Sequence, residues 1–257
     1  MVKLTSPVTI SLILSGVAAA LSGAALLIAA GMIEIGEAPA PNIEAQTRAY
    51  LLDNPEVILD AIGRLEERQQ AAEADELKTA LRDNAEEIFN SPTSPVMGNP
   101  DGDVTIVEFF DYNCPYCRQA MPMLAEAAGA DPSLRLVFKE WPILGPGSED
   151  AAGLALAAAR QQKYEAFHKA LMAQSGRVDE RAALDVAAGV GLDVERLKRD
   201  LNDPEIAAEI ARNLALADAL RITGTPTFVV GNEIIRGLVD LTTLQRVIAD
   251  ARAKPGE

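Results

Sequence analysis

Residues 104–117 read Val-Thr-Ile-Val-Glu-Phe-Phe-Asp-Tyr-Asn-Cys-Pro-Tyr-Cys, and this stretch decides the fold. Its first seven residues are rich in β-branched and aromatic side chains, which favour a strand. Two cysteines, Cys114 and Cys117, follow shortly afterwards with Pro115 between them. Proline suits the first turn of a helix, because its missing N–H would have no partner there. The stretch therefore predicts a strand that delivers two thiols to the start of a helix.

Cys114 and Cys117 are the only cysteines in the 257-residue chain. Their spacing places both sulfur atoms on one helical turn, close enough to form a small disulfide ring. We expect Cys114 at the exposed N-terminus of the helix and Cys117 facing inward. Free amide N–H groups and the helix dipole lower a thiol pKa at that end. Cys114 is therefore predicted to be the nucleophile and Cys117 the resolving thiol.

A structural disulfide and a metal site are the other roles open to this cysteine pair. An inert structural disulfide is disfavoured, because a bridge across four residues removes little chain entropy. A zinc site needs four ligands, and the single histidine, His168, lies far along the chain. We expect no metal ligands of that kind and place His168 on a helix as a partly exposed residue. Two thiolates suffice for Cu(I), so copper(I) binding remains the alternative function.

Three segments, in this order along the chain, resemble the signature motifs of DsbA-like thiol-disulfide oxidoreductases of the thioredoxin superfamily. They are residues 109–118, residues 138–145 (Phe-Lys-Glu-Trp-Pro-Ile-Leu-Gly) and residues 224–228 (Gly-Thr-Pro-Thr-Phe). The resemblance implies an α/β fold, with a thioredoxin-like sheet and an inserted helical subdomain at about residues 148–222. It also implies a redox-active Cys114–Cys117 disulfide and no dissociable cofactor.

The resemblance implies further roles around the cysteines. Pro226 is expected to be cis and to lie against the disulfide, and Thr225 to offer backbone groups to an extended substrate chain. Pro115 and Tyr116, between the cysteines, are expected to contact substrate as well. An ordinary turn proline before the strand 227–230 is the alternative for Pro226.

The resemblance has one departure between the cysteines. Tyr116 stands where DsbA itself has a histidine. Tyrosine brings no cation to stabilise the thiolate of Cys114. We therefore expect a milder oxidant than DsbA.

Glu108 and Lys139 each interrupt an apolar strand, residues 104–110 and 134–139 respectively. Charges in central strands are almost never buried without a partner. We expect the two side chains to meet beneath the redox centre, as the matching acid and lysine do in DsbA-like proteins, where they tune the thiol pKa. The alternative is two unrelated residues that point out of strand ends.

The N-terminal residues 4–33 contain no charged residue. A membrane-spanning helix needs about 20 apolar residues, whereas the core of a secretory signal has about 7 to 15. Residues 1–36 are therefore predicted to hold a single-pass anchor in the inner (cytoplasmic) membrane, with a cleaved signal as the alternative. Lys3 precedes the run and Glu34 follows it, so the positive-inside rule places the rest of the chain in the periplasm or extracytoplasmic space.

Residues 37–94 are expected to form a linker and a helical module. Residues 43–90 are predicted to be helical, with a new helix start at residues 54–55, an Asn-Pro pair. Four apolar residues share one face of the predicted helix: Leu51, Ile58, Ile62 and Leu65. This stripe is too narrow for a core of its own and indicates helix–helix association. We expect a homo-oligomer through residues 43–90, with a solvated helical spacer as the alternative.

The same module resembles the N-terminal part of ScsC-type proteins, a DsbA-like branch linked to copper tolerance. Residues 53–59 and 68–70 carry this resemblance. Members of that branch can oligomerise through the module and act as disulfide isomerases.

Residues 95–257 are expected to form the DsbA-like catalytic domain. Its predicted elements after the strand 134–139 are helices at 149–175 and 179–220, strands at 227–230 and 233–236, and a last helix from about 241 to 253. Such a domain is large enough to bury a core without help from a disulfide.

The chain carries 23 basic and 38 acidic residues, a net charge of −15, which excludes nucleic acid as a partner. We expect the substrates to be unfolded or misoxidised exported proteins, together with a membrane redox partner that is an oxidase or a reductase. Oxidase, isomerase and reductase activities share the same residues. The net direction of the reaction therefore stays open.

Overall fold

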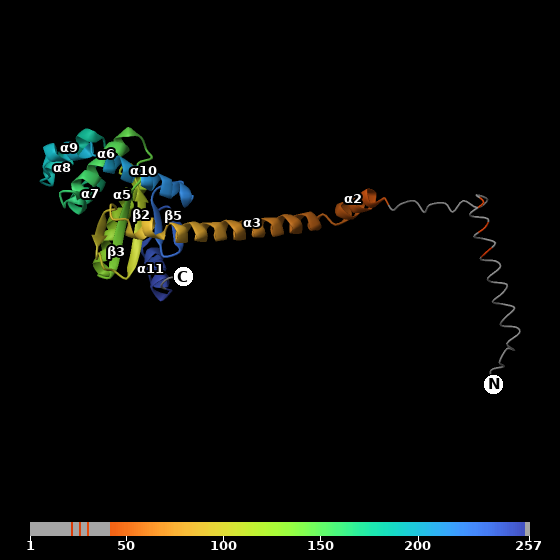
Figure 1. Cartoon of the computed structure of the whole chain (residues 1–257). Coiled ribbons are helices and arrows are strands. Elements are labelled where there is room, and N and C mark those ends of the chain that lie inside the picture. Colours follow the sequence, from red (N-terminus) through yellow and green to blue (C-terminus); the bar gives the residue numbers. More distant parts are fainter. Residues whose placement is uncertain (1–21, 23–25, 27–29, 31–41, 255–257) are drawn as a thin grey trace. The chain divides into compact units, whose positions relative to one another are not determined.

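The computed structural model describes residues 42–254 together with Ser22, Leu26 and Ala30 (Figure 1). The anchor predicted within residues 1–36 therefore lies outside the described residues apart from those three positions. Within the described part of the chain, no helix is long and apolar enough to cross a membrane. The chain divides into two compact units, Met1–Glu67 and Arg68–Glu257.

The first unit contains α2 (Ile43–Asp53) and the beginning of α3 (Glu56–Asp83). Asn42 caps α2, because its side-chain oxygen accepts a hydrogen bond from the amide of Ala45 at 3.0 Å. The predicted break at the Asn-Pro pair is confirmed, since α2 ends before it and α3 begins after it. Several apolar side chains of this unit are exposed: Leu52, Ile58, Leu59, Ile62 and Leu65.

The second unit is built on a five-stranded mixed sheet with strand order β1-β3-β2-β4-β5. The strands are β1 (Val96–Gly98), β2 (Val104–Phe110), β3 (Leu134–Glu140), β4 (Thr227–Val230) and β5 (Glu233–Arg236). β2 and β3 are parallel, and the other neighbours are antiparallel. The near-continuous apolar runs of β2 and β3 suit strands that are buried on both faces.

Helices connect and cover these strands (Figure 1). α5 (Pro115–Ala130) links β2 to β3, and α11 (Leu241–Ala253) follows β5. Five helices lie between β3 and β4: α6 (Pro146–Ala159), α7 (Tyr164–Met172), α8 (Glu180–Gly189), α9 (Val194–Leu201) and α10 (Pro204–Ala219). The predicted strand pair and last helix are confirmed, and the predicted helical insertion occupies the expected part of the chain.

Two hydrophobic clusters lie on opposite faces of the sheet, because successive side chains of a strand point to opposite sides. Ile106 and Phe110 of β2 join the larger cluster, with α5, α6, α7 and α11. Val107 and Phe109 join the smaller cluster. That second cluster also contains Leu81 of α3, Ile88 of α4 (Ala85–Asn90), and Leu216 of α10. The end of α3 and α4 therefore belong to the core of the second unit.

Candidate active site

The end of β2 positions both cysteines at the N-terminus of α5. Cys114 is the N-cap residue of α5, and Pro115 occupies its first turn. Both cysteines are free thiols, and both are buried, with Cys114 4% and Cys117 0% exposed. The prediction that Cys114 is exposed is therefore wrong. Tyr116, which is 57% exposed, is the large side chain that the motif presents to solvent.

The residue that covers Cys114 comes from the loop before β4. Cys114 Sγ lies 3.3 Å from the carbonyl oxygen of Thr225, which is half-buried. The Thr225–Pro226 peptide bond is cis, so that part of the sequence prediction is confirmed. Pro226 is buried. The carbonyl group of Thr225 can accept a hydrogen bond from the protonated thiol but not from a thiolate.

The two thiols have opposite pKa shifts. The hydrogen bond from the Cys117 thiol, helped by the amide N–H groups of Cys117 and Tyr116, lowers the pKa of Cys114 to about 5. Burial raises the pKa of Cys117, and the hydrogen bond to Cys114 and the charge of Glu108 raise it further. Near neutral pH the site therefore holds a thiolate at Cys114 and a protonated thiol at Cys117. This is the division of roles expected for a nucleophile and a resolving thiol.

Glu108 lies on the same face of β2 as Ile106 and Phe110, which pack in the cluster that contains both cysteines. It is 1% exposed, and its Oε1 atom has no hydrogen-bond partner among the residues described. Burial raises the pKa of Glu108 well above its usual value, and the negative charge of Cys114 adds to the shift. Glu108 is thus a buried acid that holds its proton and lies within electrostatic reach of both thiols.

The predicted pairing of Glu108 with Lys139 is wrong. In the parallel register of β2 and β3, Glu108 is opposite Phe138, whereas Lys139 is opposite Phe109. The two charged side chains therefore point to opposite faces of the sheet. A one-residue offset in the pairing of the two strands places the side chains on opposite faces. The sequence of either strand alone does not show this offset.

Lys139 instead holds the segment before β1 against the sheet. Its Nζ atom donates to Ser94 Oγ at 2.7 Å and to the carbonyl oxygen of Glu87. Ser94 in turn donates to Glu209 Oε1 at 3.0 Å. Burial lowers the pKa of Lys139 to about 8, against the raising effect of the nearby carboxylates of Glu209 and Glu87. Lys139 belongs to a buried polar network on the face away from the cysteines.

Asp111, at the end of β2, anchors the active-site loop, and sequence reasoning missed it. Its Oδ1 atom accepts from the amide of Asn113 at 2.7 Å and from the Ser148 hydroxyl at 2.8 Å. Its Oδ2 atom accepts from the amides of Ile143 and Leu144, at 2.9 and 3.0 Å. One buried carboxylate thus joins the loop before Cys114 to the segment after β3 and to α6. The position of Asp111, directly after an apolar strand and just before the cysteines, is the sequence feature that could have identified it as a site residue.

A second buried polar cluster lies behind this loop, and it corrects the prediction for His168. His168 is fully buried, and its Nδ1 atom lies 2.9 Å from the hydroxyl of Tyr112. The hydroxyls of Tyr112 and Tyr164 both donate to Glu140 Oε1, at 3.1 and 2.9 Å. Burial lowers the pKa of His168 to about 3, so the ring is neutral. The amphipathic pattern around His168 predicts a helix. It does not predict that Tyr112, far earlier in the chain, supplies a polar partner for the ring.

Exposed apolar side chains lie on the motif and on the segment that Asp111 binds. Tyr116 is exposed in the motif itself, and Ile143 and Leu144 are 39% and 43% exposed. Because Asp111 binds the amides of Ile143 and Leu144, these side chains are held close to the active-site loop. The site therefore combines a reactive sulfur with an exposed apolar border.

This chain belongs to the family of DSBA-like thioredoxin domains, which matches residues 105–249. A second family, the copper resistance protein ScsC N-terminal domain, matches residues 42–72. The predicted resemblance to DsbA-like oxidoreductases and to their ScsC-type branch is confirmed, as is the thioredoxin-like α/β fold of the second unit.

Solved structures agree with this assignment. A thioredoxin-like oxidoreductase from Silicibacter pomeroyi DSS-3 is 54% identical, with a TM-score of 0.64, over 65% of this chain and 97% of that chain. Proteus mirabilis ScsC in a transitional conformation is 30% identical, with a TM-score of 0.64, over 82% of this chain and 96% of that chain. The second comparison extends over the helical module as well as the thioredoxin-like domain.

Two named relatives differ in how much of their length is matched. The probable disulfide bond formation protein D of Bacillus anthracis is 28% identical over 181 residues, 65% of this chain and 82% of that protein. The Na(+)/H(+) antiporter NhaA 3 of Salinispora tropica is 32% identical over 166 residues, 62% of this chain. The match spans only 26% of the length of the antiporter.

Proposed function

We propose that this protein is an extracytoplasmic thiol-disulfide oxidoreductase that forms, isomerises or reduces disulfides in exported proteins. The observation that carries the proposal is the opposite pKa shift of two thiols at one helix N-terminus, with Cys114 lowered to about 5 and Cys117 raised. A thiolate is the attacking species in disulfide exchange, and a low-pKa thiol is also a good leaving group. Both directions of exchange are thus supported at Cys114.

The reductive direction proceeds in two steps. The thiolate of Cys114 attacks one sulfur of a substrate disulfide, so the substrate S–S bond breaks, a mixed disulfide forms and the second substrate sulfur leaves as a thiolate. Cys117 then gives up its proton and attacks Cys114 Sγ. This step releases the first substrate sulfur as a thiolate and leaves a Cys114–Cys117 disulfide. The substrate gains two electrons and the protein loses two, and the oxidative direction is the reverse.

Glu108 is proposed to exchange the proton of Cys117. Its carboxyl group is buried and its charge raises the pKa of Cys117, so the two groups influence each other's proton affinity. Because Glu108 holds its proton, it can donate that proton to the Cys117 thiolate that leaves when a substrate thiolate attacks the Cys114–Cys117 disulfide. In the reductive direction it can accept the proton of Cys117 only after it has lost its own. Lys139 is not part of this proposal, because it lies on the other face of the sheet.

Unfolded or misoxidised exported proteins are the proposed substrates. The exposed side chains of Tyr116, Ile143 and Leu144 suit apolar segments of many sequences. Thr225, beside the reactive sulfur, offers backbone groups to an extended chain. A membrane oxidase or reductase that resets the dithiol is the proposed redox partner.

The helical module is proposed to make the protein a homo-oligomer. Ile58, Ile62 and Leu65 are about half exposed, at 47%, 46% and 55%, and none of residues 42–67 is buried. Burial against a second copy would remove this apolar surface from water. Several redox sites around one substrate would favour isomerisation.

Anchoring in the inner membrane through the uncharged run at residues 4–33, with the redox site outside the cytoplasm, is the proposed location. The test is fractionation of cells that produce the full chain. Recovery in the membrane fraction after alkaline washing is expected, and recovery in the soluble extract would contradict the anchor.

The activity is tested with two assays on the same protein. Insulin reduction reports dithiol exchange, and refolding of scrambled ribonuclease reports isomerisation. We expect the parent protein to be active in at least one assay and the Cys114→Ser protein to be inactive in it. A protein that has neither activity at any redox poise would refute the proposal.

Copper(I) binding is the second candidate, favoured by the match of residues 42–72 to the N-terminal domain of a copper resistance protein. The reduced pair Cys114 and Cys117 offers two soft sulfur ligands. Within residues 42–254, no cluster of three or more His, Cys, Asp or Glu is placed to hold a metal ion. Competition with a Cu(I) chelator separates the two functions, because sequestration needs tight binding without turnover.

A further inference from the structure

A cleft with a volume of about 810 Å³ lies at the end of the sheet opposite the cysteines. It is bordered by the end of α3, α4, the start of β2, the β4–β5 turn and the end of α11. Val104 begins β2 and lines the cleft, whereas Cys114 follows the other end of that strand. Seven residues of strand span roughly 20 Å. The cleft is therefore separate from the redox site.

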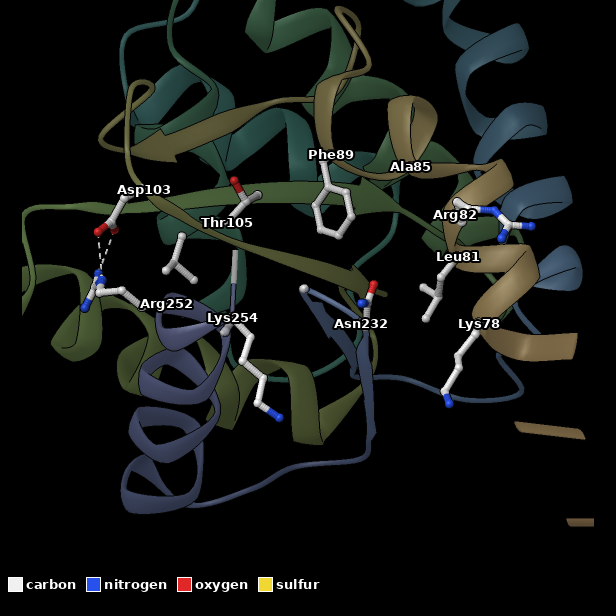
Figure 2. A pocket seen from close by; sticks show the side chains of 13 residues that line it. Lys78, Leu81, Arg82, Ala85, Phe89, Asp103, Thr105, Asn232, Arg252 and Lys254 are labelled. Carbon is white, nitrogen blue, oxygen red and sulfur yellow. Dashed lines mark hydrogen bonds and ion pairs between the residues drawn. The ribbon is translucent and has the colours of Figure 1, made fainter. Parts of the chain in front are cut away.

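The floor of the cleft is apolar. Leu81 and Val104 are buried there, and Phe89 and Ala85 are half-buried. Figure 2 shows the ring of Phe89 in the middle of the view, between the α3–α4 segment and Asn232 of the β4–β5 turn. A partly exposed aromatic ring in a concave surface is a contact site for an apolar group.

The rim of the cleft is positively charged, although the whole chain carries a net charge of −15. Its one acid is Asp103, which binds Arg252 through two hydrogen bonds of 2.7 and 2.8 Å (Figure 2). The remaining charged residues of the lining are three cations, Lys78, Arg82 and Lys254. The cleft thus has an excess of positive charge.

Those three cations have few competing partners. Lys78 and Arg82 contact Asp75 and Asp83 at 3.9 and 3.4 Å, and all four side chains are more than half exposed. Exposed pairs of this kind contribute little. Lys254 has no ion pair with any residue in the described part of the chain.

These features select one class of ligand. A purely apolar molecule would use the apolar floor but leave the cations of the rim without an anionic partner. A small inorganic anion would leave the ring of Phe89 and the side chain of Leu81 in water. A molecule with an apolar chain and one anionic head satisfies both parts, and the volume of the cleft is in the range of small-molecule sites, about 300–1,000 Å³.

We propose that this cleft binds a single amphipathic carboxylate of the fatty-acid class. The acyl chain lies against Leu81 and Phe89. The carboxylate is held at the α3 side of the rim, by Lys78 and Arg82, whereas Lys254 lies on the α11 side of the cleft (Figure 2). Because the cleft is at the far end of β2, the ligand leaves the dithiol chemistry unchanged.

The test is calorimetric titration of residues 42–257 with decanoate. Both hydrophobic clusters lie within residues 81–248, so this chain retains its folded core without the uncharged run. Saturable binding of one decanoate is expected, with decanol and acetate each at least about tenfold weaker, which corresponds to about 1.4 kcal/mol. The double variant Lys78→Gln/Arg82→Gln should also weaken decanoate about tenfold, since both residues are exposed and their replacement does not disturb the core.

Lys169→Gln/Lys198→Gln is the matched control, because it removes two exposed cations from α7 and α9, outside the cleft. It should bind decanoate like the parent chain, and both double variants should keep full insulin reduction. Equal binding of decanol, or equal losses in the two double variants, would overturn the proposal. So would absence of decanoate binding together with binding to phosphatidylglycerol vesicles, since that result would indicate a membrane surface rather than a single free molecule.

Discussion

Cys114 Sγ and the carbonyl oxygen of Thr225 are 3.3 Å apart, although 111 positions separate them in the chain. The loop before β4 therefore covers the sulfur whose pKa is lowered at the N-terminus of α5. The same loop presents backbone groups next to that sulfur. A substrate that pairs with the backbone of Thr225 would bring its own sulfur close to Cys114. The backbone that positions the substrate and the thiol that reacts with it are therefore neighbours.

Alkylation should distinguish the two thiols across pH. The pKa of Cys114 is lowered to about 5, so the thiolate fraction, and with it the rate of reaction with iodoacetamide, should rise with pH and level off above about 6. Cys117 should remain unmodified, because burial raises its pKa. The measurement is mass spectrometry of the reduced protein after timed labelling. A midpoint near 8.5, the value of an unperturbed thiol, would show that the helix N-terminus does not stabilise the thiolate.

Glu108→Gln should stabilise the reduced protein at pH 7 but not at pH 4. Burial raises the folded-state pKa of Glu108, whereas the unfolded chain ionises near 4.3. As pH rises through the unfolded value, the unfolded state releases a proton that the folded state keeps, so the native protein loses stability. Glutamine removes this loss. Urea unfolding of both proteins at the two pH values provides the measurement.

Glu126→Gln is the control for that comparison, because Glu126 is exposed on α5. It should leave the pH dependence unchanged. Equal stabilities of the Glu108→Gln and parent proteins at both pH values would contradict the claim that Glu108 is buried and protonated in the folded state. If Glu108 donates its proton to the leaving Cys117 thiolate, the oxidised Glu108→Gln protein should also form mixed disulfides with substrate thiols more slowly than the parent protein.

Asp111→Ala should destabilise the second unit by about 3 kcal/mol or more. The substitution leaves the buried Ser148 hydroxyl and the part-buried amides of Asn113, Ile143 and Leu144 without their acceptor, and an unsatisfied buried donor costs about 1–3 kcal/mol. Asp185→Ala, at an exposed position of α8, is the control and should change stability by less than about 0.5 kcal/mol. Denaturant unfolding measures both. Equal stabilities would mean that Asp111 does not hold the active-site loop.

The chain that starts at residue 68 should be a monomer, whereas residues 42–257 should be an oligomer. The exposed apolar residues of the first unit, among them Ile58 and Leu65, are absent from the shorter chain. Light scattering at micromolar concentration measures this. A monomeric longer chain would refute association through the helical module.

A chain that starts at residue 91 serves a different purpose. It lacks Leu81 and Ile88, which are 3% and 0% exposed in the smaller hydrophobic cluster. Loss of such buried side chains costs about 2–5 kcal/mol each. This shorter chain should therefore be markedly less stable than the chain from residue 68, and equal stability would show that α4 does not complete the core.

The sequence predicts well what depends on neighbouring residues. The run before Cys114 specifies a strand, Pro115 specifies a helix start, and the motif around Pro226 identified the cis bond through a family resemblance. What it does not predict depends on register and on distant partners. Lys139 is displaced from Glu108 by one position of strand pairing, and it finds Ser94 on a segment far earlier in the chain.

The same limit explains the remaining differences. His168 is buried because Tyr112 and Glu140 come from two other elements and form a polar cluster around it. Cys114 is buried because Thr225 folds over it. Each of these contacts joins segments that no local pattern relates to one another.

Trapping of mixed disulfides tests most directly whether Cys114 attacks and Cys117 resolves. Cys117→Ser and Cys114→Ser proteins are incubated with a disulfide-containing substrate, quenched with acid, and digested for mass spectrometry. We expect mixed disulfides through Cys114 in the Cys117→Ser protein, no insulin reduction by the Cys114→Ser protein, and native-like stability in both. Accumulation of mixed disulfides through Cys117 in the Cys114→Ser protein, with none in Cys117→Ser, would contradict this expectation.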